Sequence, residues 1–261
     1  MDAKLTNFAA PRILCSALLV LGLMLAKPSS ATGHEIRVWT ARALATVLAE
    51  VGPEFERKTG HKLIISSDLP NAFARRADQG EPFDILITSS TVLDDWIKQG
   101  RIQAASRTDL ARSGIGVAVR TGSPKPDITS VEAFRRTLLN AKSIAFLRVG
   151  SGIRVAALLE QLGIAEAVNA KATRPESDIV SELVAKGEIE LGLVVITQIL
   201  TTPGVELVGP LPAAIQSYIS FSGGLNSKTT VGDAAKELLN FLRSPRASTV
   251  IKAQGMELLP N

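Results

Sequence analysis

The chain is short of the residues on which many enzymes and nucleic-acid-binding proteins depend. It has one cysteine, one tyrosine, two tryptophans and two histidines among 261 residues. Cys15 lies in an apolar N-terminal run, so a protein that loses this run has no disulfide, thiolate nucleophile or thiolate metal ligand. Neither His34 nor His61 follows a predicted strand, and no G-x-S-x-G or H-E-x-x-H motif is present. Hydrolytic triads and zinc catalysis therefore have little support.

Aromatic residues are few and the charge is nearly balanced. Aromatics make up 4% of the chain, which is little for the stacked platforms of sugar or single-strand binders. The formal net charge of +4 falls by two once the N-terminal segment, with three basic residues and one acidic residue, is removed. The densest basic pairs, Arg75-Arg76 and Arg135-Arg136, lie on helical patterns typical of a solvated face. We expect no nucleic-acid partner.

The N-terminus has the pattern of an export signal. Lys4 and Arg12 precede an apolar run over 13–26, and residues 29–31 (SSA) follow it. A basic start, an apolar core and a small-residue end predict a secretory signal peptide, cleaved here after Ala31. An uncleaved anchor is the alternative, but the run is shorter than the roughly twenty residues that span a bilayer. We therefore expect a periplasmic protein.

The rest of the chain alternates predicted strands and helices. Strand patterns are short apolar or alternating runs, at 35–40, 62–67, 83–87, 114–120, 143–147, 191–196, 205–208 and 217–222. Helical spacing of apolar residues covers 43–59, 72–79, 92–99, 130–139, 153–162, 177–186, 231–242 and 247–253. This order predicts an α/β fold with parallel sheets and right-handed crossovers.

Two breaks divide the chain into lobes. The segment TGSPKPD at 121–127 has two prolines, a glycine and no apolar side chain, and is the best linker; GPLP at 209–212 is the next break. A chain that leaves one lobe near Thr121 and returns near Ser222 crosses twice, as in a hinged binding protein. The predicted organisation is a signal peptide at 1–31, lobe 1 at 32–121 plus 222–261, and lobe 2 at 122–221.

Six segments carry a resemblance to a known family. They are VWTARALATVL, FERKTGHKLIIS, AFARRADQGEPFDILITSS, SGIRVAALLEQLGI, LVAKGEIELGLVVITQIL and LLNFLRSPRASTVIKAQG. With them the sequence resembles the periplasmic molybdate-binding proteins, type II solute-binding proteins of ABC importers. The resemblance implies a two-lobe Venus-flytrap fold, each lobe a mostly parallel sheet flanked by helices. It also implies a small anionic ligand in the cleft, a membrane permease as partner, a monomer, and no cofactor, metal or catalysis.

The ligand positions depart from this family's pattern. The family holds its dianion with serine hydroxyls at the first two strand-to-helix turns, main-chain N–H groups and a tyrosine of the second lobe. The matching positions here are Ala43, the segment 68–71 (DLPN) and Val195, which lack these side-chain donors. Main-chain N–H groups of Ala43, Asn71 and Ser151 at helix starts remain able to bind an oxyanion.

Arginines lie near the same turns. Arg42 follows the first strand, which ends at Thr40, and Arg148 and Arg154 flank the turn at 150–152. A guanidinium binds a carboxylate through two parallel hydrogen bonds, so we expect a carboxylate-bearing solute or a larger oxyanion at Thr40, Arg42 and Arg154. Ion pairs between lobes or on the surface are the alternative for these arginines.

Ser89 and Ser90 end the third strand. Ligands of open α/β sheets bind beyond the carboxyl ends of the strands, so both serines are expected to face the ligand. The alternative is that Ser90 or Thr91 caps the next helix.

The sequence predicts a solute-binding protein that closes its lobes on the ligand and delivers it to a permease, and that is not an enzyme. The alternative is a dehydratase or isomerase on the same scaffold. That enzyme would use a carboxylate such as Asp178 or Glu176 together with an arginine.

Overall fold

A computed structural model describes residue 1 and residues 33–259 of the chain. The predicted signal peptide therefore lies outside the described residues, Met1 excepted. No helix in the described part is long and apolar enough to cross a membrane.

Helices and strands alternate along the described chain, and the predicted α/β class is confirmed. The strands are β1 (Glu35–Thr40), β2 (Lys62–Ser67), β3 (Ile85–Ser89), β4 (Thr108–Arg120), β5 (Ile144–Ala145), β6 (Ala172–Thr173), β7 (Leu191–Val195), β8 (Val205–Pro210), β9 (Tyr218–Leu225) and β10 (Glu257–Leu258). The helices are α1 (Arg42–Thr59), α2 (Pro70–Asp78), α3 (Ser90–Lys98), α4 (Val131–Asn140), α5 (Ser151–Gln161), α6 (Ala165–Asn169), α7 (Val180–Lys186), α8 (Ile196–Thr201), α9 (Gly232–Phe241) and α10 (Pro245–Ala253).

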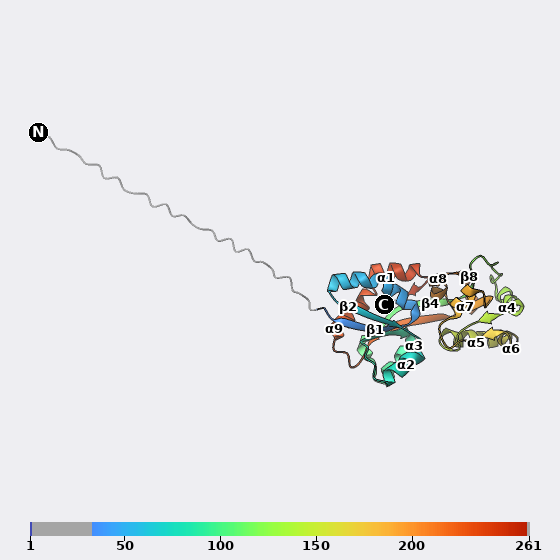
Figure 1. Cartoon of the computed structure of the whole chain (residues 1–261), viewed down its shortest axis with the longest axis horizontal. Coiled ribbons are helices and arrows are strands. Elements are labelled where there is room, and N and C mark those ends of the chain that lie inside the picture. The colour runs from blue at the N-terminus through green and yellow to red at the C-terminus, as the bar shows by residue number, and fades with distance from the viewer. Residues whose placement is uncertain (2–32, 260–261) are drawn as a thin grey trace. The chain divides into compact units, whose positions relative to one another are not determined.

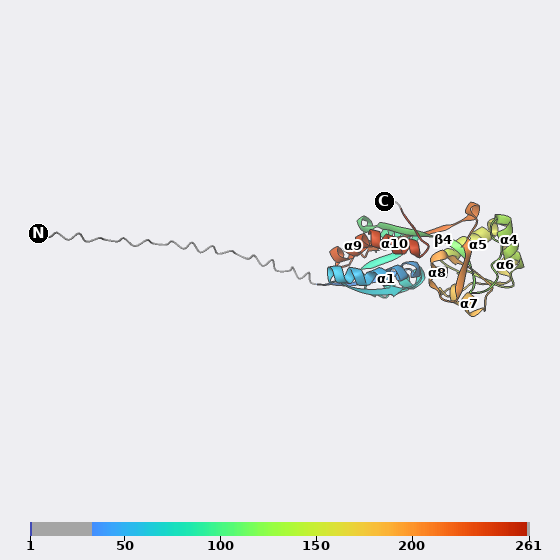
Figure 2. The same cartoon turned by 90° about the horizontal axis from the view of Figure 1, so that it is seen from above.

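Two groups of parallel strands are joined by two long strands that run antiparallel to them. The strand order is β2-β1-β3-β9-β4-β7-β5-β6, with β8 and β10 also paired to β4. β1 pairs in parallel with β2 and β3, and β5 pairs in parallel with β6 and β7. In Figure 2, β4 lies between the group α1, α9 and α10 and the group α4 to α7. Each parallel group thus has its own helices, as the two-lobe prediction requires.

The strand β4 changes partner in its middle. Residues up to Gly114 pair with β9, and residues from Ile115 pair with β7 and β8. The side-chain amide of Gln216 bonds both main-chain groups of Ile115, at 3.0 Å each. The sequence prediction placed the crossing at the linker near Thr121, whereas the change of partner lies inside the strand. The lobe bounds themselves stay a prediction.

Each parallel group has an apolar core. Around β1 and β3, side chains of α1, α9 and α10 such as Leu44, Val47 and Leu238 are almost fully buried. Figure 1 shows α1 on one face of β1 and β2, and α2 and α3 on the other, where Trp39 and Phe73 pack together. A second core of α4, α5 and α6 covers β5 and β7. These cores fix the strand ends, which is where polar side chains gather.

The turn between β5 and α5 depends on a glycine. A Cβ at Gly152 would lie 1.6 Å from the main-chain oxygen of Leu147, so the chain must move to accept any side chain. We expect Gly152→Ala to lower the free energy of unfolding by about 3 kcal/mol or more. Urea denaturation checks this, with Gly232→Ala as the control because its Cβ would approach no atom closer than 4.0 Å. Equal midpoints for the two variants would contradict the close approach.

Candidate functional site

A cleft of about 410 Å³ lies beyond the carboxyl ends of β1, β2 and β6. It is lined by Arg42, Ser67, Asp68, Leu69, Asn71, Ala72, Arg75, Glu176, Ser177 and Asp178. Open α/β sheets bind their ligands at this edge. A larger groove of about 740 Å³ borders Ser143, directly before β5, and Leu191, the first residue of β7. Because the larger groove lies at the amino ends of those strands, the smaller cleft is the candidate site.

Arg42, the first residue of α1, connects the two groups of strands across this cleft. Its Nη1 donates to the main-chain oxygen of Asp178 at 2.7 Å, and its Nη2 forms an ion pair with Glu182 of α7. Both side chains keep about a third of their surface exposed, at 33% and 35%. These contacts use two of the guanidinium N–H groups and leave the others for a ligand.

Asp178 lies in the turn before α7. The sequence predicted a helix over 177–186, but α7 begins only at Val180. The reason is local, because residues 177–179 form a turn closed by the Ile179 N–H on the Ser177 oxygen at 2.9 Å. The Asp178 side chain is therefore free to face the cleft, and its Oδ2 accepts a hydrogen bond from Gln198 Nε2 at 2.6 Å.

The environment of Asp178 changes its acidity. The pKa of Asp178 is raised to about 6. Burial raises this pKa the most, the nearby Arg42 charge lowers it, and the Glu182 charge raises it. A carboxylate that holds its proton this tightly is a stronger base than an exposed aspartate, and it is still ionised at neutral pH. The cleft therefore contains a group suited to taking up and returning a proton.

Polar atoms around Asp178 lack partners within the described residues. Glu182 Oε2, Gln198 Oε1 and Ser181 Oγ are buried and make no hydrogen bond to any described residue. Buried polar atoms are nearly always hydrogen-bonded, so each such atom calls for an explanation. The two acceptors and one hydroxyl belong to the helices α7 and α8, whose residues Glu182 and Gln198 interact with Arg42 and Asp178 respectively.

The structure brings some of the predicted site residues together. Arg42 and Asn71 line the cleft, and so do Asp178 and Glu176 of the enzyme alternative. Glu176 is exposed and forms an ion pair with Arg148 at 3.7 Å. The residues that the sequence proposed for an isomerase therefore share one cleft with the predicted arginine.

Other predicted residues do not line this cleft. Ala43 and Val195 are buried in the apolar core with 3% and 4% of their surface exposed. Thr40 is fully buried, and its Oγ1 donates to the Ala41 main-chain oxygen at 3.2 Å. Ser151 is buried at the start of α5, and Arg154 is exposed on the same helix. Their role in binding stays a prediction.

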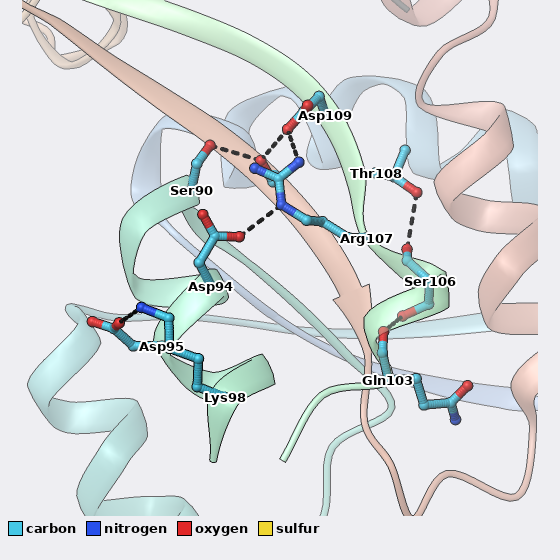
Figure 3. Close-up of polar contacts among 10 residues, drawn as sticks. Ser90, Asp94, Asp95, Lys98, Gln103, Ser106, Arg107, Thr108 and Asp109 are labelled. Carbon is cyan, nitrogen blue, oxygen red and sulfur yellow. Dashed lines mark hydrogen bonds and ion pairs between the residues drawn. The ribbon is translucent and has the colours of Figure 1, made fainter. Parts of the chain in front are cut away.

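Ser90 belongs to a hydrogen-bonded chain of side chains, most of which Figure 3 shows. Ser222 Oγ donates to Asp109 at 2.6 Å, and the two serine hydroxyls lie 2.7 Å apart. Since Ser222 has a single hydroxyl hydrogen, Ser90 is the donor to Ser222 and can only accept from a ligand. Burial raises the pKa of Asp109, but hydrogen bonds from Ser222 and Arg107 outweigh it and leave the pKa lowered, so the chain stays polarised in this direction at neutral pH.

This network also bears on the capping alternative. Helix α3 begins at Ser90, and Ser89 before it makes no side-chain capping bond. Ser90 therefore donates its hydroxyl hydrogen to Ser222 of β9. It has only lone pairs left to face an anion, which it cannot bind as a donor. Ser89 and Ser90 do not line the cleft around Asp178.

Sequence reasoning missed three residues of the site: Arg75, Glu182 and Gln198. Arg75 stands four residues after Asn71 on α2, so helical spacing could have placed both on one face. Glu182 stands four residues after Asp178, but the turn at 175–179 removes that regularity. Gln198 follows the end of β7, and only its polarity after a buried strand could have suggested it.

Comparison with known proteins places the chain among binding proteins of bacteria. A family model described as bacterial extracellular solute-binding protein matches residues 36–257. A molybdate-binding protein of Azotobacter vinelandii is 26% identical over 243 residues, 88% of this chain and 92% of the relative. A solved structure of the Azotobacter vinelandii periplasmic molybdate-binding protein has a TM-score of 0.73 and 21% identity, and covers 87% of this chain and 100% of that one. The predicted family resemblance and type II binding-protein fold are thereby confirmed.

A further relative corrects one prediction. An aconitate isomerase of a Pseudomonas species is 32% identical over 258 residues, 96% of this chain and 97% of the relative. The expectation that the chain is not an enzyme is therefore wrong. It rested on a family resemblance and on missing triad motifs, and neither excludes an isomerase.

Proposed function

This chain belongs to the bacterial extracellular solute-binding protein family, and from that premise we propose that it is an isomerase acting on an unsaturated carboxylic acid in the cleft at Arg42 and Asp178. Aconitate, the substrate named for the Pseudomonas relative, is the first candidate. Members of the family act outside the cytoplasm, in agreement with the predicted export signal.

The proposed chemistry is a proton shift. Aconitate is a propene that carries one carboxylate on each carbon. The Asp178 carboxylate removes a proton from the methylene carbon, and the electron pair of that C–H bond is shared between the two terminal carbons and their carboxylates. The proton returns to the former vinyl carbon, so the double bond moves and Asp178 is ionised again. The new double bond joins the former methylene carbon to the central carbon. The orientation in which the carboxylate on the former methylene carbon is held therefore decides whether this bond is cis or trans.

One observation carries this proposal: a carboxylate with a raised pKa and an arginine share the cleft. An Arg42 guanidinium at the solute carboxylate stabilises the negative charge that develops when the proton leaves. Asp178, with a pKa of about 6, is ionised at neutral pH and more basic than an ordinary aspartate. No second protein group is required, because the same carboxyl takes and returns the proton.

Delivery of an anion to a membrane permease is the second candidate function. The family match and the molybdate-binding relative favour it. The alanine and valine at the positions of the family's serine and tyrosine favour a carboxylate over a tetrahedral oxyanion.

Turnover tests the proposal directly. The protein purified from the periplasm is incubated separately with cis- and trans-aconitate, and the isomers are separated by chromatography. We expect both reactions to approach the same mixture, while a heat-inactivated sample leaves each isomer unchanged. Stable isomers in the presence of folded protein would refute the isomerase and leave the binding function.

A further inference from the structure

We propose that Arg75 binds a second carboxylate of the solute, so that the cleft takes a di- or tricarboxylate; this inference rests on the proposed function. Arg75 lies on α2 and lines the same cleft as Arg42 and Asp178. Asn71, one helical turn earlier, lines it too, so one face of α2 forms a wall of the cleft.

Arg75 differs from its neighbour in that its side chain has no partner. Among the described residues the Arg75 guanidinium makes no hydrogen bond, ion pair or aromatic contact, and the side chain is exposed. Arg76, by contrast, bonds Glu81 and Ser66, the latter at 2.8 Å, and stacks over Trp39 at 4.3 Å. Arg76 thus fixes α2 to the sheet, whereas Arg75 presents a free guanidinium to the cleft.

None of the acids of the cleft rim forms an ion pair with Arg75 among the described residues. Asp68 accepts a hydrogen bond from the Leu69 N–H at 2.8 Å, and Glu176 pairs with Arg148. Asp178 is held by Gln198. The fork of N–H groups on Arg75 therefore remains open to an incoming carboxylate, which it matches through two parallel hydrogen bonds.

Two arginines in one cleft explain how an isomerase controls its product. Arg42 begins α1 and contacts Glu182 of α7, and Arg75 belongs to α2. A solute held at both has two of its carboxylates fixed, which restricts rotation about its central bonds while Asp178 moves the proton. A monocarboxylate lacks the second anchor.

Calorimetric titration with tricarballylate, the saturated tricarboxylate that cannot isomerise, tests this independently of turnover. We expect Arg75→Ala to raise the dissociation constant about 10- to 100-fold, as for the loss of one charge-assisted bidentate contact. Arg75→Lys should recover part of the loss, because the charge remains without the fork. The control is Arg57→Ala on α1, an exposed arginine without an ion pair in the described part, and it should bind like the wild type.

The outcomes separate the two proposals. Unchanged tricarballylate affinity in Arg75→Ala, with an unchanged melting temperature, overturns the role of Arg75 even if aconitate is isomerised. A loss of affinity in Arg75→Ala, together with stable aconitate isomers, supports the second anchor and refutes the isomerase. Absence of tricarballylate binding by the wild-type protein overturns the polycarboxylate site.

Discussion

Replacing Asp178 by asparagine is expected to lower kcat for aconitate isomerisation by about 10²- to 10⁴-fold, the contribution typical of a positioned base. Asparagine keeps the size of the side chain and can still accept from Gln198, but it cannot take up the proton. KM should change little, because Arg42 still binds the solute. Steady-state rates measured in both directions check this, with Asp95→Asn, on the exposed surface of α3, as the control. Wild-type rates in Asp178→Asn would remove this residue from the chemistry.

The same variant should be more stable than the wild type at neutral pH. The folded state raises the pKa of Asp178 from 3.8 to about 6, so between these values the native state binds more protons than the unfolded state. Wild-type stability from this group therefore falls as pH rises from about 4 to 6 and stays low above it. Removing the carboxyl should recover about 1–3 kcal/mol at pH 7.5 and little at pH 4. A stable but inactive Asp178→Asn protein separates lost chemistry from lost folding.

Replacing Arg42 by alanine is expected to weaken carboxylate binding about 100-fold, because the solute loses a bidentate charge-assisted contact. The measurements are KM for aconitate and the ligand-induced rise in melting temperature with tricarballylate. Arg42→Lys should recover part of the binding, since a lysine keeps the charge but not the fork.

Molybdate provides the contrasting ligand for Arg42. An oxyanion held by main-chain N–H groups at helix starts would bind Arg42→Ala almost as well as the wild type. A thermal shift by molybdate that survives in Arg42→Ala, with no shift by tricarballylate in the wild type, would contradict the carboxylate site.

Much of the fold could be predicted from local pattern. The first two strands, at 35–40 and 62–67, occupy the predicted residues because apolar alternation and a following helix define them locally. The strand β4 was predicted only from Gly114, but it begins at Thr108. Its first half contains two charged residues: Arg112 bonds Glu257, and Asp109 accepts a hydrogen bond from Ser222. The apolar pattern therefore does not reveal this half of the strand.

The part of the site that lies directly after a strand could be predicted from the sequence. Arg42 follows the first strand, and this alone placed it at the carboxyl edge of the sheet. Its contact with Asp178 joins residues 136 positions apart, which no local pattern reveals. The acidity of Asp178 depends on burial, which the sequence does not contain. For this reason an isomerase was only the alternative to the predicted binding protein, although the carboxylate and the arginine were both named.

Proton NMR of trans-aconitate in D₂O with catalytic amounts of the protein tests the central claim most directly. The wild-type protein should produce cis-aconitate and introduce deuterium at the carbon that receives the proton, because the Asp178 proton exchanges with solvent, while Asp178→Asn should do neither at a comparable rate. An unchanged trans-aconitate spectrum, with the methylene signal intact and the protein shown by thermal shift to bind the ligand, would contradict it.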